Sequence, residues 1–183
     1  MDISNISSIK NIAFGQGAFS QLKSIILERQ SFQEKKNLSR NFVIYIDDFF
    51  ESNEAMINPL KSIENTEIHY IDSSKEPTTA LINDLRDRHL SQNEIPGGLI
   101  AIGGGVTLDI VKALSNLLNN KGNAEDYQGW DLVKNKGVYK IGVPTLSGTG
   151  AESSRTCVLI NEKTGLKLGM NSDFTLFDEL VLD

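Results

Sequence analysis

The chain has 183 residues, of which 39% are hydrophobic, and its formal net charge is −6 with a pI near 5.0. An acidic chain lacks the positive field that attracts nucleic acids, so we expect no nucleic-acid partner. No apolar run approaches the roughly 18 residues of a membrane span, and the first residues lack the features of a signal peptide. We therefore expect a cytoplasmic protein with no membrane partner.

The first elements alternate between strand and helix patterns. Residues 11–17 predict a short strand and a turn, and residues 31–41 are polar and predict a loop. Between them, apolar residues recur at helical spacing. They are Phe19, Leu22, Ile25 and Ile26. The continuous apolar run at residues 42–46 is typical of a strand buried on both faces, and it ends at Asp47.

The alternation continues to residue 102. A helix is predicted at about residues 53–63, and a strand at residues 67–71. Proline is favoured in the first turn of a helix, so Pro77 is predicted to open a helix that runs through His89. The apolar run at residues 98–102 predicts the next strand.

The stretch GGGVTLDIVK, at residues 103–112, joins that strand to an amphipathic helix that runs to about residue 118. A glycine turn at a helix N-terminus presents backbone N–H groups at the positive end of the helix dipole, which suits a diphosphate. A Cβ would hold the anion away from those groups. We therefore expect Gly103, Gly104, Gly105 and the amide of Val106 to cradle a diphosphate. The alternative is a tight turn with no ligand.

A second glycine-rich loop follows the apolar strand predicted at residues 138–143. It reads PTLSGTGAE and covers residues 144–152. In an open parallel sheet, loops at the carboxyl ends of neighbouring strands meet at one crevice. Two such loops at one crevice indicate a nucleotide site.

The remaining segments predict a long polar loop at residues 119–137 and a β-hairpin whose strands cover residues 155–160 and 166–170. A last short strand is predicted at residues 180–183. Cys157 is the single cysteine, which excludes an intramolecular disulfide, and its strand-like surroundings predict a buried, inert thiol. The fold predicted for residues 1–183 is one α/β domain. It has a Rossmann-like parallel sheet, helices on both faces and a C-terminal hairpin.

The two glycine loops together resemble the motifs of the iron-containing alcohol dehydrogenase family, which has a dehydroquinate synthase-like fold. Members carry GGGSxxDxxK and then PTTxGTG[SA]E. Here Val106 replaces the serine of the first motif, and Leu146 replaces the second threonine of the second motif. The segment SGTG at residues 147–150 favours this family over dehydroquinate synthases and glycerol dehydrogenases.

The resemblance implies an NAD site and roles for several side chains. Thr145 and Thr149 match threonines that contact the adenine and ribose side of the cofactor, or else they bond only their own loop. Lys167 matches a lysine that reaches the ribose near the nicotinamide, or else it is simply solvated. Asp109 either contacts the cofactor or pairs with Lys112 at i, i+3.

Position also suggests a role for Asp47. A carboxylate at the end of a buried strand can accept bonds from ribose hydroxyls and repel a 2′-phosphate, so NAD is expected over NADP. The alternatives are that Asp48 takes this role instead, or that both residues have a plain turn role.

In this family the divalent metal, iron or zinc, is held by one aspartate and three histidines in a helical domain, and we expect no such domain within residues 1–183. The two histidines, His69 and His89, are predicted to be surface or packing residues. The resemblance therefore implies the nucleotide-binding half of an oxidoreductase for a primary alcohol or an aldehyde, with this chain alone inactive. The alternative is a stand-alone dinucleotide-binding module without catalysis. A homodimer is left open.

A narrower resemblance concerns the substrate. Residues 127–133, with Arg155 and Thr156, are similar to the 3-deoxy-octulosonate 8-oxidase group of this family. Members of that group oxidise an eight-carbon sugar acid in lipopolysaccharide biosynthesis. The resemblance implies a small alcohol or sugar-acid substrate.

Overall fold

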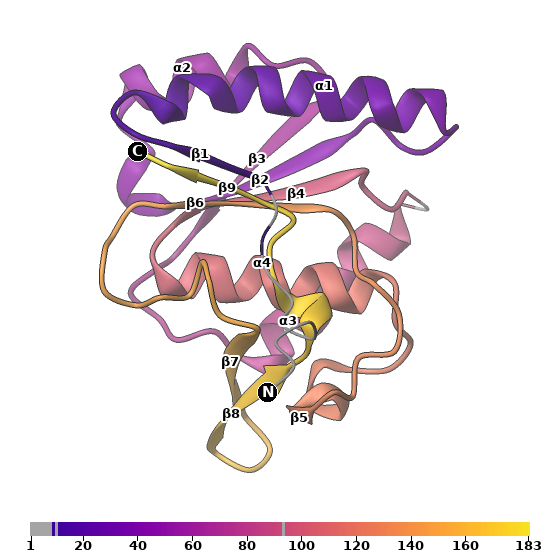
Figure 1. The fold of residues 1–183 in the computed structure, drawn as a ribbon. Helices are drawn as coiled ribbons and strands as arrows, with labels where there is room; N and C mark the ends of the chain where they lie inside the picture. Colours follow the sequence, from indigo (N-terminus) through magenta and orange to yellow (C-terminus); the bar gives the residue numbers. More distant parts are fainter. Residues whose placement is uncertain (1–8, 10, 93) are drawn as a thin grey trace, which may run out of the picture.

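The computed structural model describes residues 9, 11–92 and 94–183. Six strands form one parallel sheet in the order β1-β9-β6-β4-β2-β3 (Figure 1). These strands are β1 (Asn11–Phe14), β2 (Phe42–Asp47), β3 (Thr66–Ile71), β4 (Gly98–Gly103), β6 (Lys140–Pro144) and β9 (Glu179–Leu182). The predicted Rossmann-like parallel sheet is confirmed.

Helices cover both faces of this sheet, as predicted. Helices α1 (Leu22–Lys35) and α2 (Glu54–Lys61) lie on one face, and α3 (Thr79–Ser91) and α4 (Gly105–Leu118) lie on the other (Figure 1). Short 3-10 turns connect some of these elements: η1 (Ala18–Gln21), η2 (Asp48–Phe50), η3 (Ala124–Tyr127) and η4 (Asp173–Thr175).

The core follows the alternation of side chains along the strands. In β2, Phe42 and Ile44 pack with α1 and α2, while Val43 and Tyr45 pack with α3 and α4. All six residues of β2 are buried, which confirms the prediction of a strand buried on both faces.

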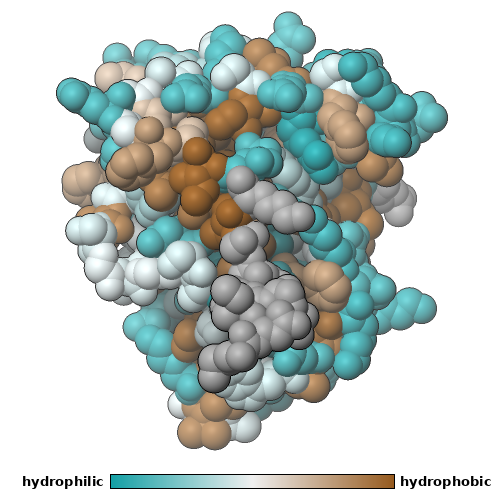
Figure 2. Space-filling model, in the orientation of Figure 1, coloured by the Kyte–Doolittle hydropathy of each residue, from teal (hydrophilic) through white to brown (hydrophobic). Residues whose placement is uncertain are grey.

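The last strand pairs with the first. β9 lies between β6 and β1, and β1 forms one edge of the sheet. The Asp183 carboxylate accepts hydrogen bonds from the backbone N–H groups of Gly17 and Phe19, at 2.9 Å each. Apolar residues are visible in the region of β1 and β9 (Figure 2), where Phe14 is 82% exposed.

The predicted hairpin is present beneath α4. Its strands, β7 (Thr156–Asn161) and β8 (Leu166–Asn171), are antiparallel. The loop predicted at residues 119–137 contains η3 and a short strand, β5 (Gly129–Trp130), which pairs with β8. This pairing was not predicted, because two residues are too few to show a strand pattern.

Most predicted boundaries differ from the structure by one or two residues, and two differences have a clear physical reason. Residues 31–35 continue α1 instead of forming a loop, since the buried side chain of Gln33 donates a hydrogen bond to the Gly97 carbonyl at 2.7 Å. Pro77 precedes α3 rather than opening it, because the Thr78 side chain caps the helix by accepting from the N–H of Leu81.

In the described part of the chain, every helix is too short or too polar to cross a bilayer.

Candidate functional site

The glycine turn joins β4 to α4 at the carboxyl end of the sheet. Gly104 is the N-cap of α4, with φ −81° and ψ −168°, a conformation open to any residue. None of the three glycines has a positive φ, so backbone conformation does not require glycine here, and the space around each one decides. A Cβ on Gly103 would lie 2.1 Å from Oδ1 of Asp47, whereas one on Gly104 would lie 3.2 Å from Cδ1 of Leu146. Only the first distance is prohibitive.

Asp47 lies at the end of β2, beside the turn. This residue is only 6% exposed, and its Oδ2 accepts a hydrogen bond from the N–H of Gly104 at 3.0 Å. Its Oδ1 accepts another from the hydroxyl of Thr107. The structure thus places Asp47 in the turn role that was the alternative to ribose binding. Carboxylate oxygens have further acceptor sites, so both roles are compatible.

The loop after β6 folds over the glycine turn, as predicted from the two motifs. The N–H of Thr145 donates to the carbonyl of Gly103 at 3.0 Å, which joins the two loops directly. The side chain of Thr149 lies 3.4 Å from the position of a Cβ on Gly105, so the loop returns to the start of α4. The Thr149 hydroxyl also accepts from the N–H of Ala151, at 3.3 Å.

A groove of about 490 Å³ adjoins this second loop on the side of α2 and η1. Its lining residues are Phe19, Phe50, Met56, Val143, Pro144, Thr145, Leu146, Ser147, Glu152, Leu182 and Asp183. Phe19, Phe50, Met56 and Leu182 give it an apolar wall that sequence analysis did not identify, because they come from four separate segments. In Figure 2 the pale loop on the left follows the course of the β6–β7 connection in Figure 1.

Asp109 and Lys112 are directed away from the glycine turn. Oδ2 of Asp109 accepts a hydrogen bond from the N–H of Val158 at 3.0 Å, and Nζ of Lys112 donates to the carbonyls of Ala151, Ser154 and Thr156. Burial raises the pKa of the Asp109 carboxyl. Lys112 thus holds the end of the second loop and the residues after it, and Asp109 holds β7. Neither the predicted cofactor contact nor the predicted Asp109–Lys112 pair included this arrangement.

Lys167 lies on β8, where Nζ forms an ion pair with Oε2 of Glu76 at 2.8 Å. Its side chain is 52% exposed. This geometry fits the solvated alternative, and it leaves the ammonium accessible to a ligand.

The histidines are surface or packing residues, as predicted. Nε2 of the buried His89 lies 2.8 Å from the Tyr45 hydroxyl, and Nε2 of His69 lies 2.8 Å from Oε1 of Glu67. Cys157 is fully buried, and burial raises the pKa of its thiol to about 12, which agrees with the predicted inert thiol. Within residues 9, 11–92 and 94–183, no three His, Cys, Asp or Glu side chains are grouped to hold a metal ion. These residues do not fit a catalytic metal site.

One residue of the site, Thr107, was missed from sequence; its hydroxyl donates to Asp47. Lys112 was named from sequence only as a partner of Asp109, and its contacts with Ala151, Ser154 and Thr156 were not predicted. Its place between the apolar residues Val111 and Ala113 was a signal that its side chain is buried. A cation at such a position needs buried partners.

Comparison with known proteins adds the family context. The family model described as iron-containing alcohol dehydrogenase matches residues 10–183. Sulfoacetaldehyde reductase of Bilophila wadsworthia (strain 3_1_6) is 42% identical over 85 residues, covering 46% of this chain and 22% of that protein. 4-Hydroxybutyrate dehydrogenase of Clostridium kluyveri is 30% identical over 151 residues, covering 78% of this chain and 38% of that protein.

Solved structures share the fold. Sulfoacetaldehyde reductase from Bifidobacterium kashiwanohense, crystallised in complex with NAD⁺, superposes with a TM-score of 0.78 at 22% identity. That match covers 98% of this chain and 46% of that one. A 1,3-propanediol oxidoreductase superposes with a TM-score of 0.79 at 19% identity, covering 96% and 44%. The chain spans less than half the length of each of these relatives.

Proposed function

Because the chain belongs to the iron-containing alcohol dehydrogenase family, we propose that its described residues form the NAD-binding half of an alcohol or aldehyde oxidoreductase. The observation that carries this proposal is the bare glycine turn at the N-terminus of α4, with the second loop folded over it. The first-turn N–H groups of a helix have no intrahelical acceptor and lie at the positive end of its dipole. They suit the diphosphate of a dinucleotide.

Individual residues take the following proposed roles. The amides of Gly105 and Val106 bind the diphosphate, while the Gly104 N–H is already engaged by Asp47. The hydroxyls of Thr145 and Thr149 serve the adenosine side. The dinucleotide, when bound, supplies the nicotinamide that accepts or donates the hydride.

The cofactor preference rests on Asp47. A buried carboxylate beside the turn adds negative charge near a ribose bound there, and this charge disfavours a 2′-phosphate. We therefore propose NAD over NADP. The solved relative in complex with NAD⁺ supports this choice.

We assign no metal ligand to this chain, since its described residues contain no suitable group of side chains. The family's divalent metal, iron or zinc, belongs in this proposal to the complete enzyme. The described residues accordingly bind and orient the dinucleotide, and we assign them no step at the substrate carbon.

The substrate class is proposed at two levels. The broader proposal is a small alcohol or aldehyde, in line with the names of the relatives, which include sulfoacetaldehyde reductase and 4-hydroxybutyrate dehydrogenase. The narrower proposal is an eight-carbon sugar acid. It rests on the resemblance of residues 127–133, Arg155 and Thr156 to the 3-deoxy-octulosonate 8-oxidase group, and an ion pair between Arg155 and Asp131 holds these two segments together.

Calorimetric titration of the 183-residue chain with NAD⁺ and with NADP⁺ tests the proposal. We expect saturable binding of NAD⁺ and weaker binding of NADP⁺. Equal binding of the two would contradict the role of Asp47, and no binding of either would contradict the proposed function. Stoichiometric iron or zinc with turnover of a small alcohol by this chain would show that the metal site has been misplaced.

A further inference from the structure

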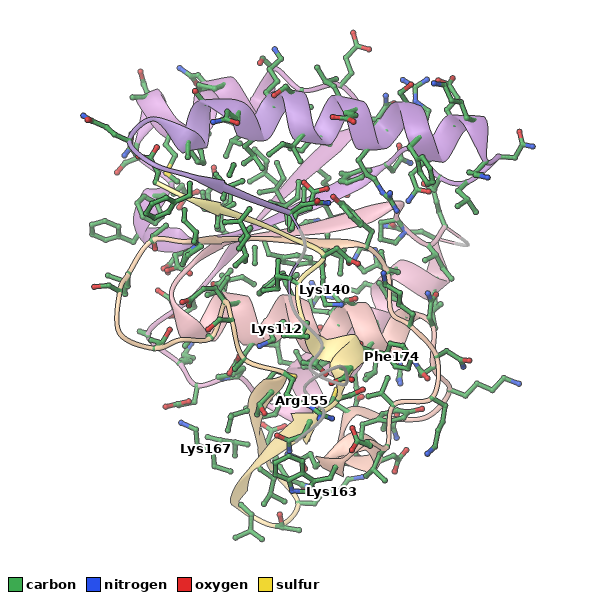
Figure 3. The ribbon with its side chains drawn as sticks, viewed as in Figure 1. Lys112, Lys140, Arg155, Lys163, Lys167 and Phe174 are labelled. Atoms are coloured by element: carbon green, nitrogen blue, oxygen red, sulfur yellow. The ribbon has the colours of Figure 1, made fainter. Side chains whose placement is uncertain are left out.

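A buried lysine lies on α4, the helix whose first turn forms the proposed cradle. Lys112 is 0% exposed, and Figure 3 shows it beside α4, with Lys140 of β6 between α4 and the sheet, while Lys163 and Lys167 lie on the hairpin below. A charged side chain in the interior is costly unless its donors are all paired. Burial accordingly lowers the pKa of Lys112.

The partners of Lys112 form an oxygen cage. Nζ lies 2.8 Å from the carbonyl oxygen of Ala151, 2.8 Å from that of Ser154 and 2.6 Å from that of Thr156. The hydroxyl of Ser154 is a fourth acceptor, at 3.1 Å. An ammonium group has three donors and no acceptor, so it satisfies three converging carbonyls where a neutral hydroxyl could satisfy only one.

All of these acceptors belong to one stretch of the chain, residues 150–156. It begins immediately after Thr149, whose side chain lies against Gly105 at the cradle, and it ends at the start of β7. The same stretch turns back at Gly150, whose carbonyl accepts from the N–H groups of Ser153 and Ser154. The cage therefore fixes the end of the second loop to α4.

Asp109 makes the complementary contact on the same helix. Its carboxylate accepts from the N–H of Val158, so α4 holds β7 through a carboxylate and the preceding loop through the ammonium group of Lys112. The hairpin that carries Lys167 is attached through the same strand, because Lys167 is paired with Ile160.

We infer that Lys112 is a positioning residue for the dinucleotide site, which holds the second loop over the glycine cradle through this oxygen cage. The inference rests on the proposed function, since the loop matters to binding only if the dinucleotide lies there. The helix that offers the diphosphate amides at its first turn also fixes, further along, the loop that completes the site.

Lys140 provides a matched control. It is also 0% exposed, and its Nζ donates to the carbonyl of Phe174 at 2.8 Å and to the hydroxyl of Ser115 at 3.2 Å. It is the first residue of β6, at the amino ends of the strands, whereas the glycine turn lies at their carboxyl ends. Replacing either lysine with methionine removes a buried ammonium group, but only one of the two holds the second loop.

The test compares Lys112→Met with Lys140→Met in the 183-residue chain, after thermal melts have shown both to be folded. We expect Lys112→Met to weaken NAD⁺ binding by about tenfold, as when bonds to a charged group are lost, and Lys140→Met to change it by less than about threefold. Similar effects of the two variants on the dissociation constant would overturn the inference.

Chemical rescue covers the case in which Lys112→Met does not fold. Lys112→Ala lacks three methylenes and the ammonium group, which n-propylammonium replaces. We expect n-propylammonium to restore the melting temperature and NAD⁺ binding of Lys112→Ala, and 1-propanol to restore neither. Equal rescue by the alcohol would show that the cavity, rather than the cage, was being filled.

Hydrogen exchange separates this inference from the proposed function. We expect amides in residues 149–156 to exchange faster in Lys112→Met, or in unrescued Lys112→Ala, than in Lys140→Met, whether or not NAD⁺ binds. A wild-type chain that binds no dinucleotide would defeat the proposed function. Unchanged exchange in these residues would defeat the positioning role.

Discussion

The carboxylate of Asp47 accepts a hydrogen bond from the backbone N–H of Gly104 at 3.0 Å, across 57 residues of sequence. This contact joins the carboxyl end of β2 to the N-cap of α4. It also explains why the preceding residue is glycine, since a Cβ on Gly103 would lie 2.1 Å from Oδ1 of the same carboxylate. Gly103 is thus required by packing against Asp47, whereas a side chain at Gly104 would fit and would affect only the proposed approach of the diphosphate.

Gly103→Ala is expected to destabilise the fold. Its methyl group would displace the buried Asp47 carboxylate, and overpacking of this kind costs about 1–3 kcal/mol. Gly104→Ala is the control, because its methyl group would lie 3.2 Å from the flexible side chain of Leu146 and 3.9 Å from Oδ2 of Asp47, an ordinary contact distance. Urea unfolding followed by circular dichroism measures both, and equal stability of the two variants would count against this division of roles.

Gly104→Val is expected to leave the chain folded and to weaken dinucleotide binding by about 2 kcal/mol, because the side chain blocks the approach of the diphosphate to the amides. The backbone conformation at Gly104 is open to valine. Calorimetry on the variant tests this. Adding Leu146→Ala shows whether the valine acts only by displacing that leucine, in which case the double variant would bind normally.

Asp47→Gly is expected to narrow the preference for NAD over NADP and to lower stability by about 1–3 kcal/mol, since two buried donors lose their acceptor. Thr107→Val is the control, because it removes one donor and keeps the carboxylate. Thr107→Val should therefore retain the cofactor preference. The preference would be attributed to another residue if Asp47→Gly left the ratio of the two dissociation constants unchanged.

Glu125 is expected to contribute acid-sensitive stability. Hydrogen bonds from Lys163 and Asn83 lower the pKa of its carboxyl from 4.5 to about 2. Because the folded-state pKa lies below the unfolded one, this stabilisation is complete above pH 4.5 and is lost as the pH falls toward 2. Unfolding free energies of wild type and Glu125→Gln should therefore differ most near neutral pH and converge in acid. A difference that is constant with pH would contradict the shift.

Much of the sheet could be predicted because its strands are locally distinctive. The run of β2 is apolar at residues 42–46, and the motif that starts at Gly103 marks both the strand end and the helix start. The pairing of β9 with β1 could not be predicted, since both strands are short and their partners are distant in sequence. The helical turn at residues 31–35 is polar, and its buried contact with Gly97 exists only in the folded chain.

The site was predictable in location but not in detail. The motifs placed the glycine turn and the second loop together at the carboxyl ends of the strands, which the contact between Thr145 and Gly103 confirms. The partners of Asp47 and Lys112 depend on how separate segments pack, and no local pattern encodes them. From sequence alone, the carboxylate of Asp47 at the end of a strand is as compatible with binding a ribose as with accepting a hydrogen bond from a turn.

Backbone NMR tests the central claim most directly, because it reports on the amides that are proposed to bind the diphosphate. In a ¹H–¹⁵N titration of the 183-residue chain with NAD⁺, we expect the largest shift changes at Gly105 and Val106, with smaller ones at Thr145 and Thr149. Saturation should give a dissociation constant that agrees with calorimetry. Binding that leaves the amides of Gly105 and Val106 unmoved, or no binding at all, would contradict a dinucleotide cradle at this turn.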